Sequence, residues 1–212
     1  MAMKRTNAIP WWGWLTWVLM VVLGILVYTH LPPLVAGEHH RETPRFLMLY
    51  EPVVMLAIML IWQGLWRIDP KRRNYEVFWP TYRYIGGMVV VGLGLVYSTI
   101  AGHLVFHLAT IRFVPTGYGI IFILIANVLP RLRPNWWIGV RSPWTLSNED
   151  SWNRSQRLAG QLGIPTGILI IILGWVLPPH RTIILAIMGP VILWVLILLV
   201  ASYFFARTPQ ES

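Results

Sequence analysis

The stretch "IILAIMGPVILWVLILLVASYFFA", residues 183–206, contains no charged residue. A helix rises about 1.5 Å per residue, so roughly 20 apolar residues cross the hydrocarbon core of a bilayer. This run therefore predicts a transmembrane helix. The whole chain agrees, because 56% of its 212 residues are hydrophobic and only 12% are charged. A soluble domain of this size would not expose so little charge, and the composition favours a membrane protein.

Five further apolar runs precede this one, and turn-forming segments separate several of them. "LPPL" (31–34), "DPKRRN" (69–74) and "LPPH" (177–180) are such turns. We expect an all-α polytopic membrane protein with six transmembrane helices, forming a single domain over residues 1–212. A short interfacial helix is expected before the fifth span. The predicted spans cover about 11–28, 46–66, 85–109, 113–129, 158–177 and 183–206.

The basic residues indicate how the chain is oriented. With the N-terminus inside and six crossings, thirteen of the 17 Lys and Arg residues fall on the inner side. The positive-inside rule then predicts that both termini are cytoplasmic. The formal net charge of +9 follows from this asymmetry and from contact with anionic lipid, so it does not indicate a nucleic-acid partner. The chain has no cysteine, which excludes disulfides and thiolate chemistry.

All six histidines fall on the opposite, outer side of this topology. In "STIAGHLVFHLAT" (98–110), Thr99, His103, His107 and Thr110 recur at helical spacing and share one face. Two histidines at i and i+4 can bind one metal ion, and zinc or another divalent metal would suit them. Further candidate ligands on this side are Glu51, His39 and His40. The alternative is that these histidines only reach water at the interface and hold no ligand.

Glu51 stands directly before Pro52, near the outer end of the second predicted span. A carboxylate at this depth is costly unless it is paired. The candidate partners are His103, His107 and Arg45. A solvated position at the headgroup level is the alternative interpretation.

The segment "LPRLRPNWWIGVRSPWTLSNEDSWNRSQRLAG", residues 129–160, is rich in tryptophan and arginine. Ser147 followed by Asp150 predicts a helix N-cap, with a short amphipathic helix running to Gly160. We expect the tryptophans to favour the membrane interface, and Arg133 and Arg141 to reach phosphates or backbone carbonyls. Gly139 permits a tight turn. The segment is interpreted either as a structural anchor or as a surface on which a partner docks.

This segment resembles the core motif of the SdpI family, named for the immunity protein of a sporulation-delaying toxin system. The resemblance is strongest over residues 129–160, and an SdpI-like core extends over 113–206. The motif residues are Asn135, Gly139, Arg141, Pro143, Trp144, Thr145, Leu146, Ser147, Trp152, Arg157, Ala159 and Gly160. In the outer segment "HLPPLVAGEHHRE" (30–42), the order of residues departs from the pattern of many relatives.

The resemblance implies a six-span protein of the bacterial cytoplasmic membrane that acts in toxin immunity, signal transduction or both. It implies a peptide toxin as partner on the outer face and a cytoplasmic regulator at loop 130–157, with no catalytic activity established for the motif. The candidate binding or structural residues are Asn135, Trp136, Trp137, Gly139, Arg141, Pro143, Trp144, Thr145 and Arg157. The competing interpretation is an outward-facing, metal-dependent membrane enzyme, or a metal or pH sensor, that uses His103 and His107. A small transporter is a third interpretation, but no internal repeat is evident in the sequence to support it.

Overall fold

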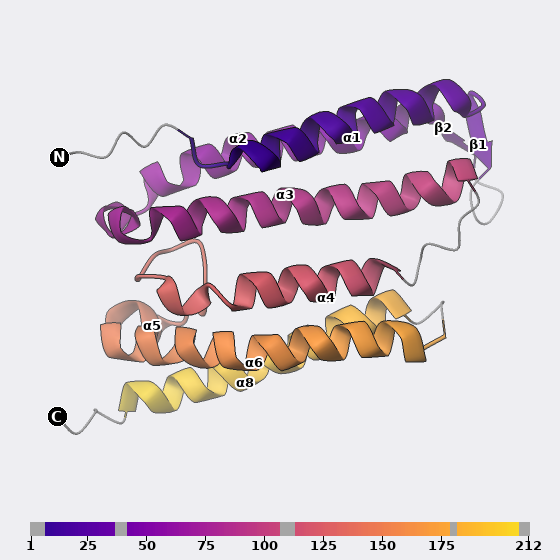
Figure 1. Ribbon diagram of the computed structural model, residues 1–212. Coiled ribbons are helices and arrows are strands. Elements are labelled where there is room, and N and C mark those ends of the chain that lie inside the picture. The colour runs from indigo at the N-terminus through magenta and orange to yellow at the C-terminus, as the bar shows by residue number, and fades with distance from the viewer. Residues whose placement is uncertain (1–6, 37–41, 107–112, 179–181, 208–212) are drawn as a thin grey trace.

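The computed structural model describes residues 7–36, 42–106, 113–178 and 182–207, and six of its helices are long and apolar enough to cross a membrane. The predicted all-α, six-span fold is thereby confirmed, and the chain is a multi-pass membrane protein. Figure 1 shows the long helices running side by side. They are α1 (Trp11–His30), α2 (Tyr50–Ile68), α3 (Tyr75–Phe106), α4 (Phe113–Ala126), α6 (Glu149–Val176) and α8 (Gly189–Arg207).

Shorter elements connect the long helices. The single-turn 3-10 helices are η2 (Arg45–Leu49), η3 (Arg72–Asn74) and η5 (Leu129–Arg131). The short helix α5 (Pro143–Ser147) precedes α6, and a π-helix, η6 (Thr182–Met188), leads into α8. Strands β1 (Leu34–Ala36) and β2 (Glu42–Pro44) pair antiparallel between α1 and α2, with Val35 opposite Thr43. This small ladder was not predicted from the sequence.

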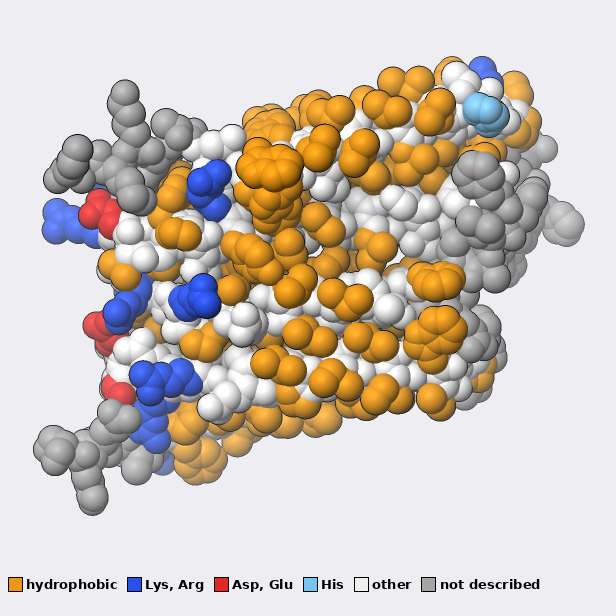
Figure 2. Space-filling view, in the orientation of Figure 1, with side chains coloured by type: hydrophobic (Ala, Val, Ile, Leu, Met, Phe, Trp, Pro, Cys, Tyr) orange, Lys and Arg blue, Asp and Glu red, His pale blue; other side chains and the backbone are white. Residues whose placement is uncertain are grey.

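The helices form two layers, in which α1, α2 and α3 pack together, as do α4, α6 and α8 (Figure 1). Helices α3 and α4 join the layers. Helix α1 begins and α8 ends at the same end of the bundle, which we call the terminal end. Figure 2 shows Lys, Arg, Asp and Glu gathered at the terminal end and an apolar belt beyond it. Six membrane-spanning helices place both ends of the chain at the same end of the bundle.

Small residues allow α4 and α6 to approach closely. A Cβ atom on Gly167 would lie 2.7 Å from the carbonyl oxygen of Gly119, and one on Gly163 would lie 2.4 Å from the Cβ of Ala126. Contacts of this kind replace the hydrophobic driving force, which is weak between helices that are already in lipid. The contact between α4 and α6 therefore depends on residues that have almost no side chain.

At the terminal end, an aromatic core crosses from one layer to the other. It includes Tyr75, Phe78 and Tyr82 of α3 together with Trp152 of α6, each at most 2% exposed. Helix α3 has a non-helical residue at Phe78 and contains Pro80, so its first turn is bent relative to the rest. The same core includes Leu132, Ile138 and Val140 from the connection between α4 and α6.

The N-terminus of α6 differs from the prediction in two respects. The N-cap is Asn148, whose side chain accepts hydrogen bonds from the backbone N–H groups of Asp150 and Ser151, so the assignment of Ser147 was wrong. The helix predicted to end near Gly160 is the first part of the continuous helix α6. The short helix before the fifth span is instead α5, which lies earlier in the chain.

We predict that Gly167→Ala lowers the melting temperature of the protein. The added Cβ would meet the Gly119 carbonyl at 2.7 Å, and overpacking of this kind costs about 1–3 kcal/mol. Gly64→Ala in α2 is the matched control, because no atom lies within 4 Å of the position of its Cβ. It should keep or raise the melting temperature through its higher helix propensity. Equal melting temperatures for the two variants in detergent would contradict the close packing.

Candidate functional site

The Trp/Arg loop, defined as residues 132–148, is folded around the side chain of Asn135. This side chain is fully buried and donates from Nδ2 to the carbonyls of Arg133 (2.9 Å) and Ile138 (3.1 Å). Its Oδ1 accepts from the backbone N–H groups of Trp137 (2.9 Å) and Ile138 (2.8 Å). One amide thus satisfies four backbone groups of a segment that has no regular secondary structure.

Gly139 brings the loop against α6. Its φ of 103° lies in the left-handed region, and a Cβ there would lie 2.7 Å from Oε1 of Gln156. The buried Gln156 accepts from the N–H of Val140 (3.2 Å) and donates to its carbonyl (3.3 Å). Glycine is therefore required at position 139 for two reasons. The backbone makes a turn with a positive φ, and the side chain of Gln156 leaves no room for a Cβ atom.

A capping box starts α5. The Ser142 hydroxyl accepts from the N–H of Thr145, and the Thr145 side chain accepts from the N–H of Ser142 at 2.8 Å. Thr145 also donates to the carbonyl of Val140 at 3.0 Å. The indole N–H of Trp144 donates to the hydroxyl of Ser202 in α8 at 2.8 Å. The hydrogen bond from Trp144 to Ser202 joins the second half of the loop to α8.

The first half of the loop is held by Asp69, which lies at the turn between α2 and α3 and is 2% exposed. Its carboxylate accepts from the Tyr75 hydroxyl (2.8 Å), the N–H of Lys71 (2.7 Å) and the N–H of Trp136 (2.9 Å). The bond to Trp136 joins residues 67 positions apart. Asp69 thereby connects the two layers of the bundle at the terminal end.

Two more polar contacts run between the same turn and the loop. Asn74 donates from Nδ2 to the carbonyl of Pro134 at 2.7 Å, and the Lys71 ammonium group donates to the carbonyl of Leu146. Sequence analysis identified neither Asp69, Asn74 nor Gln156, because their partners lie far away in the chain. In the sequence, Asp69 of "DPKRRN" indicated only a turn.

The outer surface of the loop is aromatic and basic. Trp136 is 48% exposed and Trp137 is 37% exposed. Arg141 is exposed and donates a guanidinium hydrogen bond to the carbonyl of Trp136, whereas Arg133 forms an exposed ion pair with Glu149 at 3.4 Å. Arg157 lies on α6 and is exposed. Such a surface suits the membrane interface or an acidic partner.

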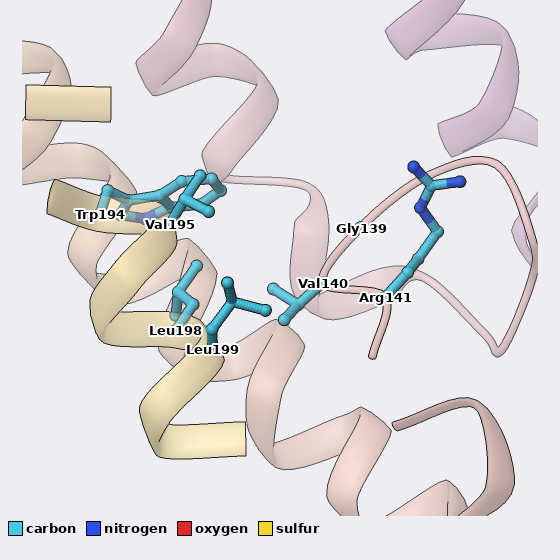
Figure 3. A pocket seen from close by; sticks show the side chains of 7 residues that line it. All are labelled: Gly139, Val140, Arg141, Trp194, Val195, Leu198 and Leu199. Carbon is cyan, nitrogen blue, oxygen red and sulfur yellow. The ribbon is translucent and has the colours of Figure 1, made fainter. Parts of the chain in front are cut away.

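A cavity of about 180 Å³ lies between the loop and α8. In Figure 3, Val140 points toward Leu199 of α8, whereas the Arg141 guanidinium points away from that helix. The remaining lining residues are Gly139, Trp194, Val195 and Leu198. Apart from Arg141, whose guanidinium points away from α8, the cavity is lined by apolar residues.

Only part of the predicted metal site can be placed. His103 and Glu51 are described, whereas His39, His40 and His107 lie outside the described residues. The described ranges contain no group of three His, Cys, Asp or Glu side chains that could hold a metal ion. Arg45, a candidate partner of Glu51, instead donates to the carbonyl of Leu31 and lies over the ring of Tyr28. The metal or proton-sensing role stays a prediction.

Comparison with known proteins agrees with the resemblance drawn from the loop. Residues 131–202 match the model of the SdpI/YfhL protein family. The chain is 24% identical over 200 residues to the immunity protein SdpI of Bacillus subtilis (strain 168), covering 92% of this chain and 94% of that protein. No solved structure matches. The predicted family resemblance is thus confirmed over the loop, α6 and most of α8, and similarity to the immunity protein extends through the first layer.

We predict that Asp69→Asn destabilises the protein strongly. An asparagine amide would present N–H groups to at least one of three donors, and each unpaired buried group costs about 1–3 kcal/mol. Glu149→Gln is the control, because its ion pair with Arg133 is exposed and contributes little. Thermal unfolding in detergent should show a large decrease in melting temperature for Asp69→Asn and little change for Glu149→Gln. A similar melting temperature for both variants would argue against the role of Asp69.

Proposed function

We propose that this chain is a toxin-immunity protein of the bacterial cytoplasmic membrane, acting in immunity, signal transduction or both. The observation that carries the proposal is the similarity to the immunity protein SdpI, which spans nearly the whole of both chains. The match to the family model covers the part of the chain with the most polar contacts.

The two ends of the bundle are assigned different roles in this proposal. The end opposite the terminal end faces the outside and recognises the toxin. The terminal end is cytoplasmic, and its exposed Trp136, Trp137 and Arg141 form an interfacial anchor on which a cytoplasmic regulator docks. Tryptophan and arginine are the residues that contribute most often to binding at protein interfaces. Because the loop is held by Asn135, Gln156 and Asp69, little conformational entropy would be lost when a partner binds.

Immunity is tested by survival. The chain should protect Bacillus subtilis cells that lack their own immunity protein when the sporulation-delaying toxin is added. The same cells carrying an empty vector, and cells carrying the Bacillus subtilis immunity protein, provide the two controls. If the chain reaches the membrane in an amount equal to that of the immunity protein and the cells still die, the proposal of immunity to this toxin is wrong.

The orientation is tested by reporter fusions. The described Lys and Arg residues other than Arg45 lie toward the terminal end, which predicts cytoplasmic readings for fusions after Arg73 and Arg157. A fusion after Arg41 should give an external reading. An external reading after Arg157 would contradict the assignment of the terminal end to the cytoplasm.

A further inference from the structure

Arg83 is an arginine within the apolar part of α3, about two turns from the start of the helix at Tyr75. Gly86 and Gly87 follow it at i+3 and i+4, so all three share one face of the helix. A Cβ on Gly86 would meet the ring of Trp62 from α2, and one on Gly87 would meet the ring of Trp12 from α1. Arg83 therefore lies on the side of α3 that packs against both other helices of its layer.

Aromatic contacts flank this position on both sides. Tyr82 stacks on Trp62 with ring centroids 4.9 Å apart, and Tyr84 contacts Trp12 edge-on at 6.2 Å. The Arg83 side chain is half-buried, whereas its Nε atom is buried and has no hydrogen-bond partner among the described residues. A guanidinium carries five N–H donors and no acceptor. The Nε atom of Arg83 thus lies near aromatic rings and has no hydrogen-bond acceptor among the described residues.

No acid of the described chain neutralises Arg83. The Asp69 carboxylate already accepts three hydrogen bonds, and Glu149 and Asp150 form ion pairs with Arg133 and Arg154. Glu76 stands seven positions before Arg83 in the same helix, which is roughly 10 Å along the helix axis. Residues 1–6 add Lys4 and Arg5 but no acid.

An anion from outside the described residues would complete this site. A planar guanidinium matches the oxygens of a phosphate with two parallel hydrogen bonds. Arg83 lies in a helix that is long and apolar enough to cross a membrane, where acyl chains surround the protein, so an amphiphile fits better than a free ion. Four further cations, Arg67, Lys71, Arg72 and Arg73, lie within the end of α2 and the turn before α3. Their positive potential favours a lipid with a net negative charge.

We propose that Arg83 binds the phosphate of an anionic phospholipid from the leaflet at the terminal end. The lipid lies against the first layer, with its headgroup near the α2–α3 turn and an acyl chain along the apolar surface. This site lies apart from the Trp/Arg loop and does not depend on toxin immunity. It gives Arg83, in the layer of α1, α2 and α3, a bound anion.

The test uses the full chain, delipidated in an uncharged detergent. Phosphatidylglycerol should raise the melting temperature by at least about 3 °C, whereas phosphatidylcholine should not. Arg83→Gln should abolish the shift. Arg131→Gln, which removes an exposed arginine from η5, should retain it. Inorganic phosphate and glycerol phosphate should give no shift, because they lack the acyl chain.

Three outcomes would overturn the proposal. They are a full phosphatidylglycerol shift in Arg83→Gln, an equal shift with phosphatidylcholine, and an equal shift with inorganic phosphate. If Arg83→Gln does not fold, Arg83→Lys keeps the charge but loses the two-pronged geometry. Native mass spectrometry should then show fewer retained phosphatidylglycerol molecules on Arg83→Lys than on the wild type. Equal retention would again contradict a phosphate bound by the guanidinium of Arg83.

Discussion

The buried carboxylate of Asp69 is the contact on which the terminal end of the bundle depends. It accepts hydrogen bonds from its own turn, from Tyr75 of α3 and from the backbone of Trp136 in the other layer. A loop without regular secondary structure must find a partner for each buried N–H and C=O group. Here Asp69, Asn135 and Gln156 supply these partners, so eleven loop residues between η5 and α5 keep one conformation beside the bilayer.

A loop fixed in this way places its aromatic and basic residues for recognition. The side chains of Trp136 and Trp137 remain exposed because their backbone groups, not their rings, carry the structural contacts. Similarity to the immunity protein SdpI extends through the first layer, which contributes Asp69 and Asn74 to the loop. The first layer is thus part of the candidate site as well as a membrane anchor, and the two layers are expected to function as one unit.

Hydropathy and turn residues were sufficient to predict six helices, because a bilayer requires apolar runs of a defined length. Tight turns were also predictable, since Gly139 is needed for a positive φ. The N-cap was misplaced by one residue because Ser147 and Asn148 are both good caps, and only the structure shows which one accepts the N–H groups. Asp69 was missed because its partner Trp136 is 67 residues away, and local patterns contain no information on such pairs.

Hydrogen exchange of the backbone amides tests most directly whether the Trp/Arg loop is folded. The N–H groups of Trp136, Trp137, Ile138 and Val140 all donate to buried side chains. In lipid nanodiscs these amides should exchange slowly, at rates comparable to those of α4 and α6. Exchange as fast as that of an unstructured peptide at these four positions would show that the loop is mobile, and would contradict a preformed surface held by Asp69.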